Sequence, residues 1–573
     1  MLIAVAPLGD GGAVLRRVGD DGTPVGSAEH VADLAAAVRG AERGGDVRWL
    51  WASAEVYPAL VRAGVSVARC HDLELTEALL LGSEGEWGAP RRLVAAWARL
   101  NGQVVTPDPP ARQPAPPGDV QEALFDPTPA DAAPPGFDTL DAAVAVYAAQ
   151  LGRIAGTPMP GRFRLLVAAE SAGGLLAVEM GRDGLPWDAG THDAVLTELL
   201  GEPSRVGGPP SRLGELAQEI ADAFGVARVN ADSPAEVLKA FRRAGYPVNS
   251  TAAWELRRID HPAVPLLTRY KELYRIWTAH GWAWRQQWVR DGRFHPEYVP
   301  AGVVSGRWAT RGGGALQIPK VIRASVRADP GWRLVVADAA QLEPRILAAV
   351  ADDPGMARAA GAGDMYAALA AEAFHGDRAI AKVALLGAMY GQVGGQAAPA
   401  LARLRQSYPK AFAYVEDAAR TGEAGGLVRS WLGRTCPPPS ASWTEGTWTG
   451  GSAAAQDGAE GWGDPESGGN VRGSVARSRA RGRFTRNFVI QATAAEWALA
   501  LLATLRTRLS GTPARIVFFQ HDEVIVHAPR DGTDEIVAAV HEAAASASQL
   551  LFGQTPVRFP LGVAVVESYA DAK

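Results

Sequence analysis

The sequence predicts a multidomain protein that combines α/β and α+β regions. Short apolar runs alternate with Ala-rich helical stretches over residues 1–100, which is typical of an α/β unit. Residues 138–285 are mostly helical in pattern. Strand-like runs return at 333–337 and 515–519, on either side of a long helical region at 355–434. At about 150 residues per domain, a chain of 573 residues has room for three or four domains.

Composition excludes several classes of protein. The chain is 47% hydrophobic and 21% charged with a formal net charge of −5, which excludes a highly charged disordered chain and a strongly basic nucleic-acid-coating protein. Two cysteines, Cys70 and Cys436, cannot form a disulfide scaffold. The sequence has no run of about 18 apolar residues and no positive region before its first apolar stretch. We expect a monomeric cytoplasmic protein without a membrane partner.

Two stretches have low complexity. Residues 102–136 are rich in proline and predict a linker or an irregular excursion. Residues 437–470 are rich in Gly, Ser, Trp and Pro and predict a flexible insertion. Its tryptophans, Trp443, Trp448 and Trp462, are able to stack on bases, but a surface loop is the favoured interpretation.

The first segment with chemical meaning is 334–345, where an apolar strand ends in Asp338 and a helix begins soon after. Pro344 suits a first helical turn, which needs no backbone N–H. A carboxylate at the end of a strand is able to face a cleft and hold a metal ion. The alternative interpretation of Asp338 is a helix cap.

The second segment, 517–527, has a polar turn between two apolar runs and predicts a β-hairpin with Asp522 and Glu523 at its tip. The flanking apolar residues should hold these acids rigidly. Asp338 and Asp522 together are suited to binding two divalent ions, as in sites that stabilise an in-line phosphoryl displacement.

The third segment, 378–391, places Arg378, Lys382 and Leu386 at a spacing of four, with Tyr390 one turn further. At about 100° per residue these side chains share one helix face. Two cations followed by apolar and aromatic groups match a nucleoside triphosphate laid along the helix. A solvated basic edge is the alternative, but lysine is rare here, with six among 57 basic residues, and this favours a specific role.

These segments resemble motifs A, B and C of the family A DNA polymerases, the family of bacterial DNA polymerase I. Motif A in that family reads roughly Asp-Tyr-Ser-Gln-Ile-Glu-Leu-Arg, which residues 338–345 match at Asp338, Gln341, Glu343 and Arg345. Motif B, Arg-x3-Lys-x3-Phe-Gly-x2-Tyr-Gly, is matched by 378–391, and motif C, His-Asp-Glu, by 521–523. Residues 305–319 and 483–495 are similar to two further stretches of the family.

The resemblance covers residues 140–573 and implies an RNase H-like N-terminal domain followed by a right-hand polymerase with an antiparallel palm sheet and helical thumb and fingers. The domains it implies are an exonuclease-like domain at 1–136, a thumb with connecting helices at 137–300, palm at 301–354, fingers at 355–480 and palm at 481–573.

The resemblance also implies the roles of individual residues. Asp338 and Asp522 would bind two Mg²⁺ ions, for which Mn²⁺ can substitute, and Glu523 would be a secondary acid near the primer end. Lys382 would hold the triphosphate and protonate the leaving pyrophosphate. The further residues expected at the nucleotide are Arg378, Leu386, Tyr390, Gln341, Glu343 and His521, and those expected at the primer–template DNA are Arg307, Arg345, Arg483, Asn487 and Gln491.

Three departures from the family pattern affect this expectation. Ala339 and Ala340 replace Tyr-Ser, Pro344 replaces Leu, and Leu386 replaces the aromatic residue that packs on the incoming sugar. Because Leu386 offers no hydroxyl to replace a missing 3′-OH contact, we expect no strong acceptance of dideoxynucleotides.

The N-terminal region is expected to have an exonuclease-like fold without proofreading. A 3′–5′ exonuclease needs a cluster of acids that begins with Asp-x-Glu on the first strand, but the first acid here is Asp10, beyond that strand. Phe137-x3-Asp141 and Asp72 only partly match the family's remaining acidic positions. Two alternatives to a polymerase remain open from the sequence, namely a catalytically inactive DNA-binding scaffold and a metal-dependent nuclease acting on dNTP-independent DNA ends.

Overall fold

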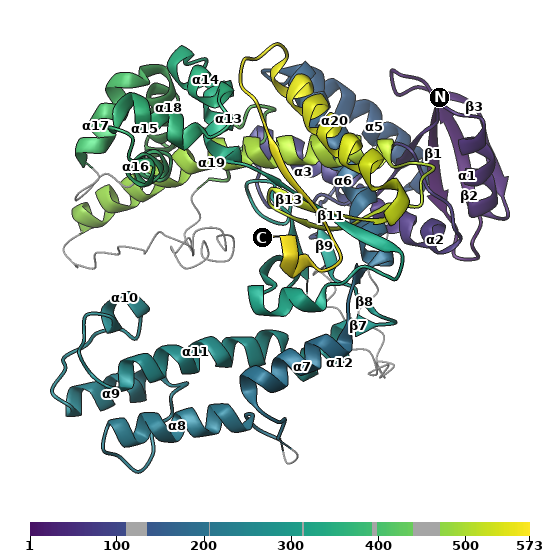
Figure 1. Ribbon diagram of the computed structural model, residues 1–573. Coiled ribbons are helices and arrows are strands. Elements are labelled where there is room, and N and C mark those ends of the chain that lie inside the picture. The colour runs from purple at the N-terminus through teal and green to yellow at the C-terminus, as the bar shows by residue number, and fades with distance from the viewer. Residues whose placement is uncertain (110–134, 205–206, 312–313, 392–397, 439–469, 573) are drawn as a thin grey trace.

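The computed structural model describes residues 1–109, 135–204, 207–311, 314–391, 398–438 and 470–572 (Figure 1). The expected linker at 102–136 and the expected insertion at 437–470 therefore lie mostly outside the described residues, as do Trp443, Trp448 and Trp462.

The N-terminal domain is built on a five-stranded mixed sheet with the order β3-β2-β1-β4-β5. Strands β2 and β3 run antiparallel to their neighbours, whereas β1, β4 and β5 are parallel to one another. The strands are β1 (Leu2–Pro7), β2 (Ala13–Val18), β3 (Pro24–Val31), β4 (Arg48–Trp51) and β5 (Cys70–Asp72).

Helices on both sides complete this domain, and polar caps start several of them. Asp33 and Asp72 accept hydrogen bonds from the first turns of α1 and α3, which satisfies N–H groups that a helix leaves free. Leu140 and Val146 of α5 share a core with Leu2 of β1, so the N-terminal domain extends beyond the expected boundary at residue 136. The helices are α1 (Leu34–Arg43), α2 (Tyr57–Arg62), α3 (Leu73–Glu84), α4 (Leu93–Leu100) and α5 (Thr139–Ala155).

A helical lobe extends from the body in Figure 1, with α8 and α11 packed against each other. A three-stranded sheet of β6 (Leu185–Pro186), β7 (Val289–Arg290) and β8 (Arg293–Phe294) lies at its base. The helices from α6 onward are α6 (Pro160–Asp183), α7 (Ala189–Leu200), α8 (Ser211–Ala223), α9 (Pro234–Arg243), α10 (Ala253–Leu256), α11 (Ala263–His280) and α12 (Trp282–Trp288).

The centre of the molecule is a four-stranded antiparallel sheet with the order β12-β13-β11-β14. Its interior strands are continuous apolar runs, because both faces are covered, on one side by α20. The sheet and its helix are β11 (Trp332–Ala339), β12 (Arg515–Gln520), β13 (Glu523–Pro529), β14 (Leu561–Val566) and α20 (Thr533–Phe552). The antiparallel sheet that the sequence led us to expect is therefore present.

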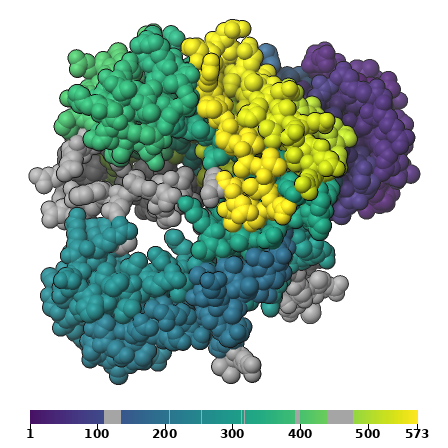
Figure 2. Space-filling model, viewed as in Figure 1, coloured from purple at the N-terminus to yellow at the C-terminus, as the bar shows by residue number. Residues whose placement is uncertain are grey.

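A second helical lobe follows β11, and Figure 2 shows the surface hollowed between this lobe and the α7–α12 lobe. A two-stranded ladder of β9 (Glu297–Val299) and β10 (Ala309–Arg311) precedes it in the chain. The helices are α13 (Leu342–Val350), α14 (Pro354–Gly361), α15 (Met365–Ala373), α16 (Arg378–Tyr390), α17 (Ala398–Ser407) and α18 (Pro409–Glu423).

The long helix α19 (Asn470–Arg508) crosses the molecule from this lobe to the N-terminal domain (Figure 1). Within the described residues, its segment Arg477–Arg508 is the one helix long and apolar enough to cross a membrane by length and composition. However, 83% of its most apolar window is buried inside the protein. At its far end Arg506 donates to Glu179 at 2.7 Å and to Tyr57 at 3.4 Å. The helix is therefore a core element that joins the domains.

Candidate active site

Asp338 and Asp522 lie side by side at one edge of the central sheet. Asp338 is the next-to-last residue of β11 and faces Glu523 in the register of β11 with β13. Asp522 lies in the turn between β12 and β13, and its carbonyl accepts a hydrogen bond of 3.0 Å from the N–H of Ala339. Asp522 is exposed and Asp338 is half-buried. The hairpin expected at 517–527 is confirmed, and it brings the two aspartates together.

The turn that presents Asp522 requires an unusual backbone. His521 has a φ of 56°, in the left-handed region that few residues other than glycine adopt. Burial, together with the nearby positive charge of Arg307, lowers the pKa of His521 to about 4. The imidazole is therefore neutral at pH 7 and is available as a hydrogen-bonding group rather than as a cation.

Glu523 differs from Asp522 in its environment, although the two are adjacent. Its side chain is 5% exposed, and Oε1 accepts a hydrogen bond from the phenol of Tyr569. Burial, followed by the charge of Glu523, raises the pKa of Tyr569, so the phenol keeps its proton. The acid expected near the primer end is thus held from behind by the C-terminal segment.

Helix α16 presents the expected face. Arg378 and Lys382 are exposed, and Leu386 and Tyr390 are half-buried. The helix buries its other side, which consists of Ala381, Ala384, Leu385, Ala388 and Met389. The spacing of four therefore predicted correctly which side chains of this helix remain accessible.

Gly391 ends α16 with a φ of 74°. A side chain at this position would be strained, and its Cβ would lie 2.9 Å from Cγ of Arg483 on α19. The glycine thus permits α16 to end where α19 passes close by.

Glu343 of α13 connects three of the segments found in the sequence. Its Oε1 accepts from Nη2 of Arg307 at 2.6 Å, and its Oε2 accepts from the hydroxyl of Tyr390 at 2.6 Å. Arg307 and Glu343 are only 15% and 14% exposed, so solvent screens this ion pair less than a surface pair. The carboxylate therefore fixes Tyr390, at the end of α16, next to the strand that carries Asp338.

A residue that sequence reasoning missed, Asp364, joins α13 to α16. Its Oδ1 accepts from Nε2 of Gln341 and its Oδ2 accepts from Nε of Arg378, both at 2.7 Å. Although burial alone would raise it, the hydrogen bonds from Arg378 and Gln341 lower the pKa of Asp364 to about 2. Asp364 also caps α15 through the N–H of Ala367, and that capping pattern is the one local signal at this position.

The expectation that Arg345 contacts DNA does not hold in this structure. Arg345 is 0% exposed. Its guanidinium donates to five backbone carbonyls, those of Ala340, Ala360, Ala362, Gly363 and Arg558, and to Oε1 of Gln341. All of its hydrogen-bonding capacity is spent inside the protein, because a buried guanidinium has to be satisfied by internal acceptors. Arg345 instead ties the start of the α14–α18 lobe to the central sheet.

Along α19 the three residues expected at DNA differ in exposure. Arg483 is exposed, whereas Asn487 is 4% exposed and Gln491 is 9% exposed. Oδ1 of Asn487 is buried without a hydrogen-bond partner among the described residues, which is unusual for an amide oxygen. Of the neighbouring arginines, Arg486 turns inward and donates to the carbonyl of Ala388.

The donor set at the sheet edge fits a hard divalent cation. Mg²⁺ prefers oxygen ligands and is usually held by one or two carboxylates together with water and substrate phosphates. Asp338 and Asp522 supply two such carboxylates at one edge. Among the described residues, no group of three or more His, Cys, Asp or Glu side chains is arranged to hold a metal ion. The pair therefore fits an ion that is completed by substrate rather than a closed structural site.

The acids considered in the N-terminal domain have structural contacts. Asp10 accepts from the N–H of Gly12 in a turn. Asp72 is 1% exposed and caps α3, and burial raises its pKa to about 7. Asp141 forms an ion pair with Arg16. These three acids are therefore spread over separate parts of the domain and serve different local contacts.

Comparisons with known proteins agree with this geometry. The family model described as DNA polymerase family A matches residues 210–570, more than half of the chain. The chain is 25% identical over 411 residues to "DNA polymerase I, thermostable" of Thermus thermophilus, covering 65% of this chain and 43% of that protein. It is 25% identical over 364 residues to DNA polymerase I of Chloroflexus aurantiacus, covering 58% and 35%. It thus spans less than half the length of these curated relatives.

A solved structure supports the fold. The POL domain of Pol1 from M. smegmatis, in complex with DNA primer-template and dNTP, superimposes with a TM-score of 0.69 and 17% sequence identity. The superposition covers 100% of this chain and 95% of that domain, so the whole chain, including its N-terminal domain, follows that architecture. Since the family model matches most of the chain and the shared motifs meet at one site, the chain belongs to DNA polymerase family A.

Proposed function

We propose that this protein is a template-directed DNA polymerase that adds deoxynucleotides to a primer 3′ end. The observation that carries the proposal is the bond from Ala339 to Asp522, which sets two aspartates side by side, on a sheet joined through Glu343 to the cationic helix α16. A nuclease has no need of a triphosphate-binding helix, and an inactive scaffold has no need of paired aspartates.

In the proposed reaction the 3′-oxygen of the primer attacks the α-phosphorus of a dNTP. A new P–O bond forms, the bond to the β-phosphate oxygen breaks, and pyrophosphate leaves. Two Mg²⁺ ions, or Mn²⁺, bound by Asp338 and Asp522 would supply charge neutralisation at the α-phosphate and activation of the primer hydroxyl.

The residues of α16 act on the triphosphate. Arg378 and Lys382 bind the phosphates, and Lys382 donates a proton to the departing pyrophosphate, which a guanidinium does poorly. Leu386 and Tyr390 border the sugar and base, and Glu343 excludes a ribose 2′-hydroxyl. Glu523 acts through its contact with Tyr569 rather than as an exposed acid.

Primer–template DNA is the proposed partner, bound by Arg307, Arg483, Asn487 and Gln491. The unpartnered amide oxygen of Asn487 supports this assignment, because a buried acceptor without a partner is suited to a donor on a ligand. Such contacts position a duplex without reading its sequence. We also propose that the molecule acts as a monomer in the cytoplasm, at the nucleoid.

The proposed layout assigns the α7–α12 lobe to the thumb, the α14–α18 lobe to the fingers and the β12-β13-β11-β14 sheet to the palm. We assign an RNase H-like fold without proofreading activity to the N-terminal domain. Its strand order β3-β2-β1-β4-β5, with antiparallel β2 and β3, supports the fold. The scattered contacts of Asp10, Asp72 and Asp141 support the missing activity.

Primer extension on an end-labelled primer–template, with Mg²⁺ and with or without dNTPs, tests the proposal. Template-dependent lengthening is expected for the native chain, and a loss of at least about a thousandfold for Asp338→Asn and Asp522→Asn. Asp531→Asn, at an exposed residue after β13, is the control and should stay active. Shortening without dNTPs would indicate a nuclease, and no change in protein that binds DNA would indicate a scaffold.

A further inference from the structure

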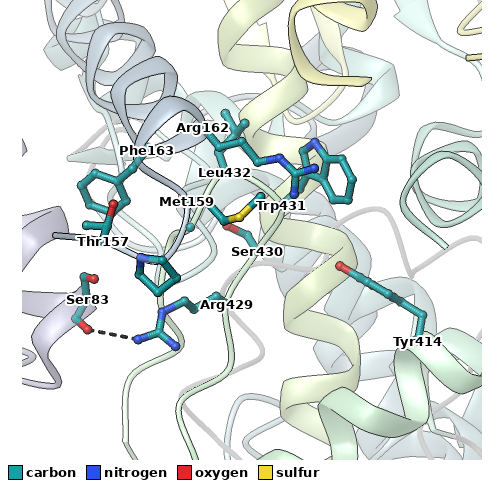
Figure 3. Close-up of a pocket in the computed structure, with 12 residues that line it drawn as sticks. Ser83, Thr157, Met159, Arg162, Phe163, Tyr414, Arg429, Ser430, Trp431 and Leu432 are labelled. Carbon is teal, nitrogen blue, oxygen red and sulfur yellow. Dashed lines mark hydrogen bonds between the residues drawn. The ribbon is translucent and has the colours of Figure 1, made fainter. Parts of the chain in front are cut away.

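A cavity lies away from the proposed active site, where three parts of the chain meet (Figure 3). Its volume is about 240 Å³. Ser83, at the end of α3, contributes one wall, and the α5–α6 connection contributes another. The remaining walls come from Tyr414 of α18 and from the segment 429–433 that follows it. No residue of this cavity belongs to the motifs that define the polymerase site.

The segment 429–433 is anchored from behind by α19. The N–H of Trp431 donates to Oγ1 of Thr493, and the N–H of Leu432 donates to Oε2 of Glu496. At about 100° per residue, Thr493 and Glu496 lie on roughly the opposite side of α19 from Arg483 and Asn487. The cavity is therefore separated from the proposed duplex-binding face by the thickness of a helix.

The cavity is positively charged. Arg162 and Arg429 line it, and neither has a carboxylate partner among the described residues. Nε of Arg429 is buried without a hydrogen-bond partner, although its Nη2 donates to the carbonyl of Ser83 at 3.3 Å. Glu496, which lies behind the lining, uses both carboxylate oxygens on Ser430 and Leu432. An anionic ligand would satisfy the two guanidinium groups.

The cavity is also aromatic and apolar. The guanidinium of Arg162 lies 3.4 Å from the ring centroid of Trp431, and Figure 3 shows the hydroxyl end of Tyr414 directed toward this stack. Met159 and Phe163 add apolar surface. Indole Nε1 of Trp431 donates to the carbonyl of Leu551 at 2.7 Å, which keeps the ring in place. Flat aromatic and guanidinium surfaces next to cations are the features with which proteins bind unpaired bases and their phosphates.

We propose that this cavity binds a single nucleotide, with its base against the Arg162–Trp431 stack and Tyr414 and its phosphate between Arg162 and Arg429. A volume of about 240 Å³ suits one nucleotide and is too small for a longer segment. A free nucleoside monophosphate and an unpaired nucleotide in a single strand share this chemistry. The proposal does not depend on polymerase activity, because it concerns residues outside the proposed active site.

The test uses the full-length protein without Mg²⁺ or dNTPs, so that its result is independent of catalysis. Arg162→Gln and Arg429→Gln remove the two cations, and Arg420→Gln removes an exposed arginine of α18 that pairs only with Asp417 in the described structure, as a matched control. Thermal melting establishes that each variant is folded. Binding is measured for dAMP by ligand-observed NMR and for a fluorescein-labelled oligo-dT by anisotropy over a salt series.

We expect Arg162→Gln and Arg429→Gln to weaken binding of at least one probe by about tenfold, while Arg420→Gln leaves it unchanged. Loss of oligo-dT binding, with a salt dependence reduced by about 0.7 per phosphate contact, identifies a strand as the ligand. Loss of dAMP binding alone identifies a free nucleotide. Unchanged binding of both probes by folded variants, or an equal loss in the control, overturns the proposal.

Discussion

The hydroxyl of Tyr390 donates a hydrogen bond of 2.6 Å to Oε2 of Glu343, across the junction between the central sheet and the α14–α18 lobe. Burial, followed by the negative charge of Glu343, raises the pKa of Tyr390, so the phenol stays protonated and remains a donor. The same carboxylate holds Arg307. The sugar-facing acid of the proposed site is therefore fixed from two directions before any nucleotide binds.

Replacing Glu343 separates its steric role from its hydrogen bonds. We expect Glu343→Ala to raise the use of a ribonucleotide relative to the deoxynucleotide by at least about tenfold, since the side chain no longer occupies the space of a 2′-hydroxyl. Tyr390→Phe leaves the carboxylate in place and should change this ratio much less. The measurement is kcat/KM for single incorporation of each nucleotide, and equal ratios in all three proteins would contradict the assignment.

Asp364 is expected to position Arg378 for the triphosphate. Asp364→Asn keeps a helix cap on α15 but removes the charge that holds Nε of Arg378. Because this ion pair is partly exposed, we expect KM for dNTP to rise only about two- to fivefold with kcat unchanged. Asp377→Asn, at the neighbouring cap of α16, is the matched control. A fall in KM would show instead that Asp364 competes with the triphosphate for Arg378.

Arg345 is expected to be essential for stability rather than for DNA binding. Arg345→Met leaves five backbone carbonyls without their donor, and a loss of roughly 3–5 kcal/mol in the free energy of unfolding should follow. Urea unfolding followed by tryptophan fluorescence measures the loss. A change below about 1 kcal/mol, accompanied by weaker DNA binding, would restore the role expected from the sequence.

His280 should make the protein sensitive to acid. Its side chain is 2% exposed, and burial, with a smaller effect from His192, lowers its pKa to about 4 from the ordinary value of 6.5. Below pH 6.5 the unfolded chain binds a proton that the folded chain does not, so stability falls as the pH falls from 6.5 toward 4.

The expected effect of this single residue between pH 7.5 and pH 5 is about 2 kcal/mol. His280→Leu should reduce the acid-induced loss of stability by about that amount, in urea unfolding at the two pH values. His541→Gln, at an exposed residue of α20, serves as the control. An identical pH dependence in the native chain and in His280→Leu would refute the assignment.

Local patterns in the sequence were enough to locate the chemistry. The strand that ends at Asp338, the hairpin that presents Asp522 and the exposed face with Arg378 and Lys382 were all predicted correctly. Each depends on the period of a single helix or strand, and that period is set by neighbours a few residues away.

Other features depended on residues far apart in the chain. Arg345 is buried because segments around residues 360 and 558 close over it, and Asp364 reaches Gln341 across 23 positions. The cavity between Arg162 and Trp431 joins segments with unrelated local patterns. No period within one helix predicts such contacts, because the packing of whole domains brings them together. The sequence thus located the reactive groups, and the tertiary structure decided which of their neighbours hold them.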